Sequence, residues 1–264
     1  MSIPVAVIGG SGLSTLLDAA TAELRLVQTP YRTVEVLVGT LGGRQIVFVP
    51  RHGAGHSVPP HRIDFRATAW ALATLGVRAI ISTAAVGSVS AAHPIGSLVI
   101  LDQYLDRTHG RADTFFEGPD VQHLPSADPF CPELRAIAKG TLGQEAVDGG
   151  TVAVVQGPRF STRAESRWLA ASGAHLINMT LYPEVALAAE LNLGTLTLAF
   201  VTDEDAGDDA MPVDAELVFE RLRAARPRIV DAVERLIAAI PADYRPRTLI
   251  EPRAVEAVLG RPTS

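Results

Sequence analysis

Short apolar runs alternate with longer amphipathic stretches along most of this chain, and this alternation constrains its fold more than any other feature. Apolar runs of this length predict buried strands, and the stretches between them predict helices. The expected strands are 4–8, 33–38, 45–49, 79–83, 97–101, 151–155, 176–179 and 195–201. The expected helices are 62–75, 132–142, 162–172, 182–193, 215–240 and 252–259. Strands and helices in alternation predict an α/β domain with a largely parallel or mixed sheet.

Length and composition agree with this prediction and limit the possible partners. The 264 residues suffice for one large domain, with a core over roughly 3–240 and a helical tail over 241–264. Hydrophobic residues make up 47% of the chain and aromatic residues only 5%, so we expect an aliphatic core. The net charge of −6 argues against nucleic acid as a partner, because nucleic acid is bound by basic surfaces. With one cysteine, Cys131, and no apolar run long enough to span a membrane, we expect a soluble cytoplasmic protein without membrane partners.

Polar or glycine-rich segments follow five of the expected strands. In open α/β sheets, ligands bind beyond the carboxyl ends of the strands. We therefore expect these segments to converge at one edge of the sheet and to form a small-molecule site. The segments are 9–12, 51–56, 84–88, 178–180 and 202–205.

Two of these segments predict an anion site. The segment 51–56 reads RHGAGH, in which Arg51 is able to bind two phosphate oxygens at once and His52 adds a further donor. The turn IGGSG at 8–12 offers backbone N–H groups and the hydroxyl of Ser11. Together they indicate an oxyanion site, most simply for phosphate. For His56, a structural role in the turn is as good an interpretation as a role in binding.

Two other interpretations of these segments are disfavoured. His52 and His56 have the i, i+4 spacing of a helical zinc site, but the glycines between them argue against a helix, so we expect no metal. Gly10 and Gly12 match the start of a dinucleotide fingerprint, but Thr15 replaces its third glycine. An oxidoreductase that binds NAD(P) therefore stays an alternative with weak support.

The later segments suit a planar base attached to a sugar. Phe160 offers a ring face for stacking and Ser161 a hydrogen bond to a ring edge, although phenylalanine at such a position usually belongs to the core. Met179 suits the floor under a sugar, and Thr180 would complete the phosphate site.

The segment 202–205 carries a pair of carboxylates, Asp203 and Asp205. In an extended segment the two side chains point the same way, since side chains alternate along it. Such a pair accepts hydrogen bonds from an exocyclic amine, and one carboxyl group is able to protonate a leaving group. Taken alone, a helix cap or a solvated acidic loop is the commoner use of these residues.

Taken together, these motifs resemble the methylthioadenosine phosphorylase family, in the trimeric branch of the purine nucleoside phosphorylases. The matching blocks follow the family order from residue 3 to about residue 240: IGGSG at 8–12, RHGxxH at 51–56, AVGS at 85–88, DQYLDRT at 102–108, ADPFCP at 127–132, GPRFST at 157–162, NMT at 178–180, PE at 183–184 and TDxD at 202–205. The resemblance implies a mixed sheet surrounded by helices and a homotrimer. It also implies phosphorolysis, in which phosphate attacks C1′ of a nucleoside and releases the base. Inorganic phosphate is then a co-substrate, and no metal or organic cofactor is used.

The resemblance also assigns roles to single residues. Phosphate would be held by Ser11, Arg51, His52, the backbone of Ala85 and Thr180. The base would contact Phe160 and Ser161, while the expected catalytic residues Asp203 and Asp205 would face N7 and the 6-amino group. The ribose and its 5′ group would contact Met179, His56, Val213 and, from a neighbouring subunit, His123 of the loop-like segment 108–129.

Base choice follows from these roles. An amine at C6 donates hydrogen bonds and suits two carboxylates, whereas a 6-oxo purine would do better with an asparagine at position 203. The first choice of substrate is therefore methylthioadenosine. The alternatives are a 6-oxopurine or methylthioinosine phosphorylase, a 5′-deoxyadenosine-type phosphorylase and, from another class, a purine-binding module without catalysis.

The chain departs from the family pattern at several positions. Gln156 replaces a usual glutamate, and the segment 206–212 replaces a longer loop that would shape the 5′ pocket. Because of this second change, 5′-deoxyadenosine or another 5′-modified adenosine stays an alternative to methylthioadenosine. The other departures are Asp64, Thr68, Ala84 and His175.

Overall fold

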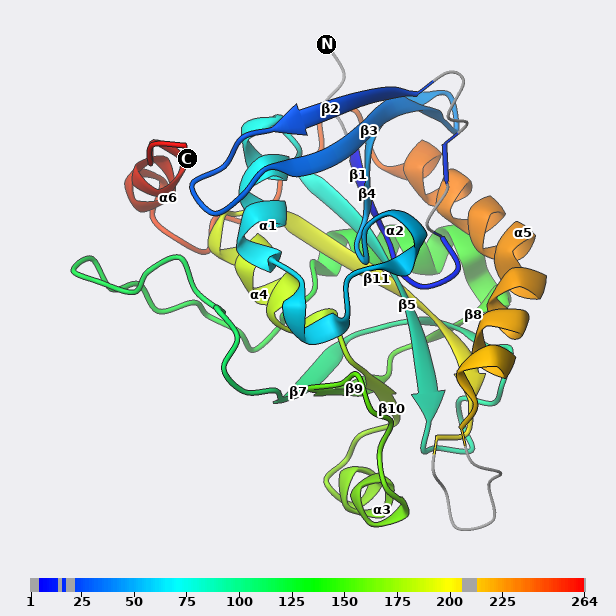
Figure 1. Cartoon of the computed structure of the whole chain (residues 1–264). Coiled ribbons are helices and arrows are strands. Elements are labelled where there is room, and N and C mark those ends of the chain that lie inside the picture. Colours follow the sequence, from blue (N-terminus) through cyan, green and yellow to red (C-terminus); the bar gives the residue numbers. More distant parts are fainter. Residues whose placement is uncertain (1–4, 14–15, 18–21, 206–212, 264) are drawn as a thin grey trace.

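The computed structural model describes residues 5–13, 16–17, 22–205 and 213–263, and in them strands of one sheet are surrounded by helices (Figure 1). The strands are β1 Val5–Gly9, β2 Glu23–Val27, β3 Val34–Leu41, β4 Arg44–Pro50, β5 Ala79–Ser88, β6 Leu98–Ile100, β7 Gln103–Arg107, β8 Ala146–Asp148, β9 Thr151–Val155, β10 Leu176–Asn178 and β11 Gly194–Asp203. The helices are α1 Phe65–Thr74, α2 Pro132–Leu142, α3 Arg163–Ala171, α4 Leu181–Glu190, α5 Ala215–Ala239 and α6 Pro252–Leu259. Short 3-10 turns occupy Ala54–His56, Pro60–Arg62 and Gly143–Glu145.

The sheet is mixed and largely parallel, as predicted. Its main path has the order β2-β3-β4-β1-β5-β10-β9-β7, while β11 pairs with β5 and β6, and β6 pairs with β8. Parallel pairs join β1 to β4 and β5, β11 to β5, β9 to β7 and β10, and β6 to β8. The strand β5 is the turning point, because its first residues pair in parallel with β1 and its last residues pair with β10 in the opposite direction.

Alternate side chains of the central strands enter two apolar cores on opposite faces of the sheet. In β1, Val5 and Val7 belong to one core, and Ala6 and Ile8 belong to the other, as the period of two in a strand requires. Helices α2 and α5 cover the first face, and α1, α4 and α6 cover the second (Figure 1). Both cores are mainly aliphatic, which confirms the expectation from composition.

Each helix and strand expected from the sequence overlaps an observed one, but three strands were not expected. These are β2, β7 and β8. In β2 the residues from Glu23 to Leu26 are all exposed. The segment ELRLV does alternate polar and apolar residues, but Leu24 and Leu26 are 59% and 60% exposed, so the alternation corresponds to no buried face. In addition, β5 and β11 extend through Ser88 and Asp203, which places Ala85 and Asp203 inside strands rather than after them.

Two peripheral segments complete the description. The segment 108–129 forms neither helix nor strand, as predicted, and part of it extends away from the sheet (Figure 1). At the C-terminal end, α6 packs on α1, where the indole N–H of Trp70 donates to the carbonyl oxygen of Val258 at 3.1 Å. Across the described part of the chain, no helix combines the length and the apolar character needed to cross a membrane.

Candidate functional site

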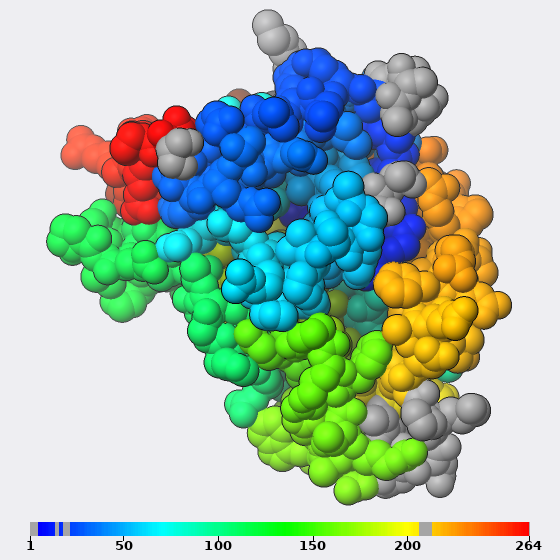
Figure 2. Space-filling model, viewed as in Figure 1, coloured from blue at the N-terminus to red at the C-terminus, as the bar shows by residue number. Residues whose placement is uncertain are grey.

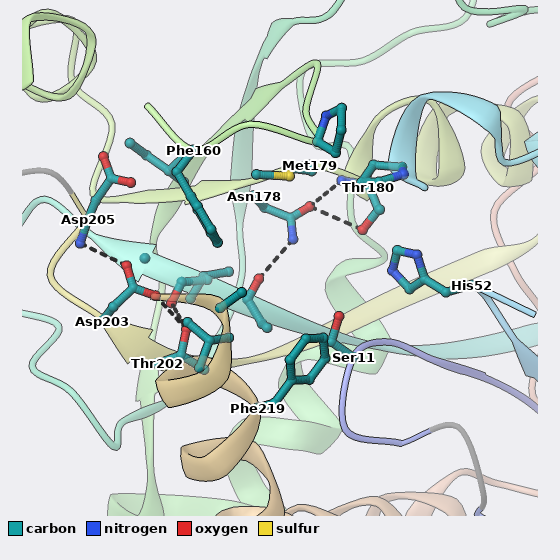
Figure 3. Close-up of a pocket in the computed structure, with 18 of the residues that line it drawn as sticks. Ser11, His52, Phe160, Asn178, Met179, Thr180, Thr202, Asp203, Asp205 and Phe219 are labelled. Carbon is teal, nitrogen blue, oxygen red and sulfur yellow. Dashed lines mark hydrogen bonds between the residues drawn. The ribbon is translucent and has the colours of Figure 1, made fainter. Parts of the chain in front are cut away.

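A cleft of about 280 Å³ lies where the predicted segments meet (Figure 3). In the space-filling view, the surface is hollowed between the residues that follow β4, the residues that precede α3 and the first turns of α5 (Figure 2). Of the predicted site residues, all except Val213 and His123 line the cleft. Those that line it are Ser11, Arg51, His52, His56, Ala85, Phe160, Ser161, Met179, Thr180, Asp203 and Asp205. The predicted segments therefore do meet at one cleft, although not at one edge of the sheet as expected.

The strand ends reach the cleft from two directions, whereas the sequence analysis expected them to meet at one edge of the sheet. The ends of β1 and β4 approach the cleft in the same direction, because these strands are parallel. The end of β10 approaches from the opposite side, since β10 runs antiparallel to the last residues of β5. The cleft thus lies across the segment Ala85–Gly87 of β5, and not along a single edge of parallel strands.

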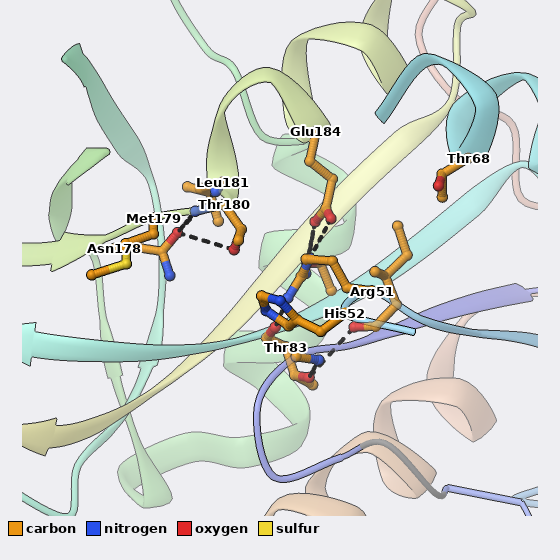
Figure 4. Close-up of polar contacts among 12 residues, drawn as sticks. Arg51, His52, Thr68, Thr83, Asn178, Met179, Thr180, Leu181 and Glu184 are labelled. Atoms are coloured by element: carbon orange, nitrogen blue, oxygen red, sulfur yellow. Dashed lines mark hydrogen bonds and ion pairs between the residues drawn. The ribbon is translucent and has the colours of Figure 1, made fainter. Parts of the chain in front are cut away.

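Arg51 forms a buried ion pair beneath the cleft (Figure 4). Its Nε and Nη2 donate to the two carboxylate oxygens of Glu184 at 2.6 and 2.9 Å. Its Nη2 and Nη1 also donate to Ser82 Oγ at 2.6 Å and to the carbonyl oxygen of Thr83 at 2.9 Å. Four of the five guanidinium N–H groups are thus occupied by described residues. The expectation that Arg51 grips two phosphate oxygens needs correction, because the fork faces Glu184, to which the sequence analysis gave no role.

The turn after β1 lies directly over this arginine. The backbone N–H of Gly10 donates to Thr83 Oγ1 at 3.0 Å. A β-carbon at Gly10 would lie 2.8 Å from Nη1 of Arg51 and 2.5 Å from the carbonyl oxygen of Thr83, so only glycine fits here. This close approach brings Ser11 to the wall of the cleft.

His52 is held in one tautomer. Its Nδ1 lies 2.9 Å from the carbonyl oxygen of Val58 and must carry the proton, since a carbonyl oxygen only accepts. Burial and the neighbouring Arg51 lower the pKa of His52 to about 4, so the ring is neutral and Nε2 is an acceptor at neutral pH.

The second histidine of the RHGAGH segment packs on the first. The ring of His56 stacks on that of His52 with 4.1 Å between centroids, and meets the edge of Phe219 at 5.3 Å. Burial lowers the pKa of His56 as well. Within the described ranges, no group of three or more His, Cys, Asp or Glu side chains is placed to hold a metal ion.

Asn178 organises the end of β10, a role that the sequence analysis missed (Figures 3 and 4). Its Nδ2 donates to the carbonyl oxygen of Ala85 at 3.0 Å. Its Oδ1 accepts from the backbone N–H groups of Thr180 and Leu181 at 2.7 and 2.8 Å. The available signal was a polar residue that ends an apolar strand just before a helix. Asn178 therefore fixes Thr180 relative to β5.

The two aspartates lie at the opposite end of the cleft from Ser11, His52 and Thr180 (Figure 3). Asp203 Oδ1 accepts from the backbone N–H of Asp205 at 2.9 Å, and Oδ2 accepts from Thr202 Oγ1 at 2.7 Å. Burial raises the pKa of Asp203. Asp205 is buried, has a φ of 47° and contacts Ser166 Oγ through Oδ2. The sequence analysis expected the two side chains to point the same way along an extended segment. The structure differs, because the chain turns after Asp203.

The remaining wall carries the residues expected near the base and the sugar. Phe160 is 38% exposed, while Ser161 Oγ is buried and has no hydrogen-bond partner among the described residues. Met179 packs against Gly157, where a β-carbon would lie 2.6 Å from the methionine sulfur. A buried hydroxyl without a partner is costly unless a ligand satisfies it.

Two predicted residues do not line the cleft. Val213 precedes α5 and lies outside the lining, which instead includes Ala215, Val218 and Phe219. These three residues share one face of the helix, because positions i, i+3 and i+4 are neighbours there. The sequence signal for this face was the apolar pair Val218 and Phe219, which lies three and four residues after Ala215. His123 is exposed on the 108–129 segment and does not line the cleft of its own chain, and the 206–212 segment lies outside the described residues.

Comparisons with known proteins agree on one family. A family model described as the phosphorylase superfamily matches residues 4–238. The S-methyl-5′-thioadenosine phosphorylase of Mycolicibacterium smegmatis is 46% identical over 236 residues, which cover 83% of this chain and 90% of that protein. The purine nucleoside phosphorylase of Streptomyces coelicolor is 44% identical over 252 residues, covering 90% and 89%. The methylthioadenosine phosphorylase from Schistosoma mansoni in complex with adenine has a TM-score of 0.85 at 33% identity, covering 97% of this chain and 96% of that one.

The buried ion pair makes a first prediction. Glu184→Gln would leave the charge of Arg51 uncompensated, and we expect the free energy of unfolding to fall by about 3 kcal/mol. Glu165→Gln is the matched control, because Glu165 pairs with Arg159 at 2.6 Å on the surface and its loss should cost less than about 1 kcal/mol. Urea unfolding of the two variants checks this difference, and equal losses would contradict it.

The pKa of His52 makes stability depend on pH. The value is about 4 in the folded protein and 6.5 for an ordinary histidine, so the unfolded chain binds the proton first as the pH falls. The stabilisation present above pH 6.5 is therefore lost towards pH 4, by about 3 kcal/mol. In urea unfolding, His52→Gln should lose less stability than the wild type over this range. His61→Gln, at an exposed histidine, should follow the wild type, and parallel curves for all three proteins would refute the assignment.

Proposed function

The chain belongs to the phosphorylase superfamily, and we propose that it converts S-methyl-5′-thioadenosine and phosphate to adenine and 5-methylthioribose 1-phosphate. The observation that carries the proposal is the division of the cleft into two chemically different ends. Hydroxyl groups and a histidine lie at one end, and two carboxyl groups lie at the other (Figure 3). A nucleoside bound between them presents C1′ to a phosphate and its base to the carboxyl groups. The relatives named as methylthioadenosine phosphorylases support the same reaction.

In this proposal, phosphate binds at the end formed by Ser11, His52, Thr180 and the backbone of Ala85. The hydroxyl group of Ser11 donates a hydrogen bond, and that of Thr180 donates one when it leaves Oδ1 of Asn178, to which it donates at 3.3 Å in this structure. Arg51 contributes the N–H that its described partners leave over. Nε2 of His52 accepts a hydrogen bond from the hydroxyl group of hydrogen phosphate, since the neutral ring carries its proton on Nδ1. The bound nucleophile is thereby positioned before reaction, and this positioning lowers the barrier.

The base binds at the other end, with Phe160 against its face and Ser161 at its edge. As the glycosidic bond breaks, the sugar becomes an oxocarbenium ion and negative charge enters the purine. Asp203 protonates N7 or hydrogen-bonds to it, and its raised pKa favours the protonated form that this step needs. Asp205 accepts a hydrogen bond from the 6-amino group. Two carboxyl groups thus favour adenine over a 6-oxo purine.

The sugar and its 5′ group lie over Met179 and extend towards His56, Val218 and Phe219. Val218 and Phe219 are apolar, and the lowered pKa of His56 keeps its ring neutral. A methylthio group suits this surface better than a hydroxyl group does, because burying an unpaired hydroxyl is costly. His123 of a neighbouring subunit would close the pocket in a homotrimer that uses no cofactor. These last features, like the cytoplasmic location, stay predictions from the sequence.

A wider choice of purine is the second candidate function. The observation that favours it is the 44% identity to the Streptomyces coelicolor protein, which is named a purine nucleoside phosphorylase. Turnover of a 6-oxo substrate distinguishes the two candidates, because Asp203 and Asp205 offer such a base no donor unless they are protonated.

The reaction itself is tested by the release of free base. We expect adenine to form from methylthioadenosine only when inorganic phosphate is present, with 5′-deoxyadenosine, adenosine and methylthioinosine as progressively poorer substrates. Chromatography of the reaction products checks both points. Base release without phosphate would overturn phosphorolysis, and equal turnover of methylthioinosine would favour the second candidate.

The role of Asp203 makes a separate prediction. Asp203→Asn keeps the shape of the side chain but removes the acid, so kcat/KM for methylthioadenosine should fall by about 100-fold or more. The free energy of unfolding should change by less than about 1 kcal/mol. Glu204→Gln, at the exposed neighbouring acid, serves as the matched control and should retain activity. An active Asp203→Asn enzyme would remove this residue from the mechanism.

A further inference from the structure

One arginine of the 108–129 segment turns back towards the cleft without lining it. The guanidinium group of Arg111 lies over the ring of Phe65, with 5.7 Å to the centroid, and donates hydrogen bonds to three residues on two separate segments. Nη2 reaches the carbonyl oxygens of Gln156 and Met179 at 3.0 and 2.9 Å, and Nη1 reaches that of Tyr182. Nε donates to the side-chain oxygen of Gln156 at 3.2 Å.

These acceptors belong to the backbone that carries the nucleoside end of the cleft. Gln156 directly precedes the segment 157–161, which brings Phe160 and Ser161 to the lining. Met179 itself lies under the proposed sugar position and packs against Gly157. A shift of either segment therefore moves the other, and Arg111 is the side chain that bonds to both.

The residues that follow Arg111 are bonded to helix α4. Two residues further along, the carboxylate of Asp113 accepts from the hydroxyl of Tyr182 at 2.8 Å. The hydroxyl of Thr114 and the backbone N–H of Phe115 then donate to the two carboxylate oxygens of Glu190, both at 2.7 Å. These bonds join the start of the 108–129 segment to both ends of α4.

The anion end of the cleft is held by other contacts. Asn178 fixes the backbone N–H of Thr180, and the partners of Arg51 are Glu184, Ser82 and Thr83. None of these bonds involves Arg111. Thr180 lies between Met179 and Tyr182, whose carbonyl oxygens Arg111 also bonds, but its backbone N–H is held separately by Asn178. Loss of Arg111 should therefore disturb the nucleoside end more than the phosphate end.

We propose that Arg111 is a positioning residue that sets the placement of Met179 and the 157–161 segment, and through them of the sugar and base. The inference rests on the proposed function, because it takes those residues to contact a nucleoside. Arg111 does not line the cleft and acts through the segments to which it bonds. Its planar fork meets four acceptors on two segments, which the single ammonium group of a lysine is unable to do.

Gln156 provides an independent means of testing the same network. Its side-chain oxygen accepts both from Nε of Arg111 and from the backbone N–H of His109, at 3.2 and 3.1 Å. Gln156→Glu retains an acceptor oxygen at this position, so it should preserve these hydrogen bonds. Gln156→Leu has a similar size but removes the acceptor, so it should reproduce the effect of losing Arg111 in weaker form.

The experiment compares Arg111→Ala and Arg111→Lys with Arg261→Ala. Arg261 is the matched control, because it also holds the 108–129 segment, through the carbonyl oxygen of Phe115 at 2.8 Å, but bonds to no cleft segment. For both Arg111 variants, we expect kcat/KM for methylthioadenosine to fall by about 100-fold and the KM for phosphate to change by less than about 2-fold. Arg261→Ala should stay within about 3-fold of the wild type. Calorimetric titration with adenine should show weaker binding for the Arg111 variants alone.

Each outcome separates the two ideas. A wild-type enzyme without phosphate-dependent release would overturn the proposed function. An active wild type would overturn the role of Arg111 in any of three cases: unchanged kinetics in the Arg111 variants, an equal effect on phosphate and nucleoside, or an equal effect in Arg261→Ala. If Arg111→Ala does not fold, Gln156→Leu decides, because wild-type kinetics in that variant would contradict the network.

Discussion

The buried ion pair between Arg51 and Glu184 is the interaction on which the rest of the cleft depends. It joins the end of β4 to the first turn of α4, and its further bonds to Ser82 and Thr83 include β5. Two charges so deeply buried are stable only when further hydrogen bonds satisfy them, and here four of the five guanidinium N–H groups of Arg51 donate to described residues. The Gly9–Gly12 turn then rests on the arginine, so the position of Ser11 follows from this pair.

The same pair changes how an anion is bound. Because its fork is directed at Glu184, Arg51 acts mainly as a support, and neutral donors around the cleft perform most of the binding in the proposed mechanism. Separate polar side chains then hold each end in place. Asn178 holds the backbone at the phosphate end, Arg111 holds it at the nucleoside end, and Asp203 holds the turn that carries Asp205. In each case a side chain fixes the backbone of another segment or of its own turn.

Several departures from the family pattern have a local structural use. Asp64 caps α1 by accepting from the backbone N–H of Ala67 at 3.0 Å. Thr68 donates to the carbonyl oxygen of Asp64 in the same turn, and His175 Nδ1 accepts from the backbone N–H of Thr151 at 3.0 Å. Gln156 accepts from Arg111 and His109, so its amide oxygen serves where a carboxylate oxygen would also serve.

The sequence by itself determined the α/β class, the approximate positions of the helices and of most strands, and the segments that form the cleft, because apolar periodicity and turn residues act over short distances. It did not determine the partner of Arg51, which lies 133 residues away, or the antiparallel direction of β10 against β5. Nor did it predict that Val218 and Phe219, and not Val213, face the cleft. These features depend on which distant segments pack together and on how the chain turns between them. Local patterns carry no record of either, so only the tertiary structure decided them.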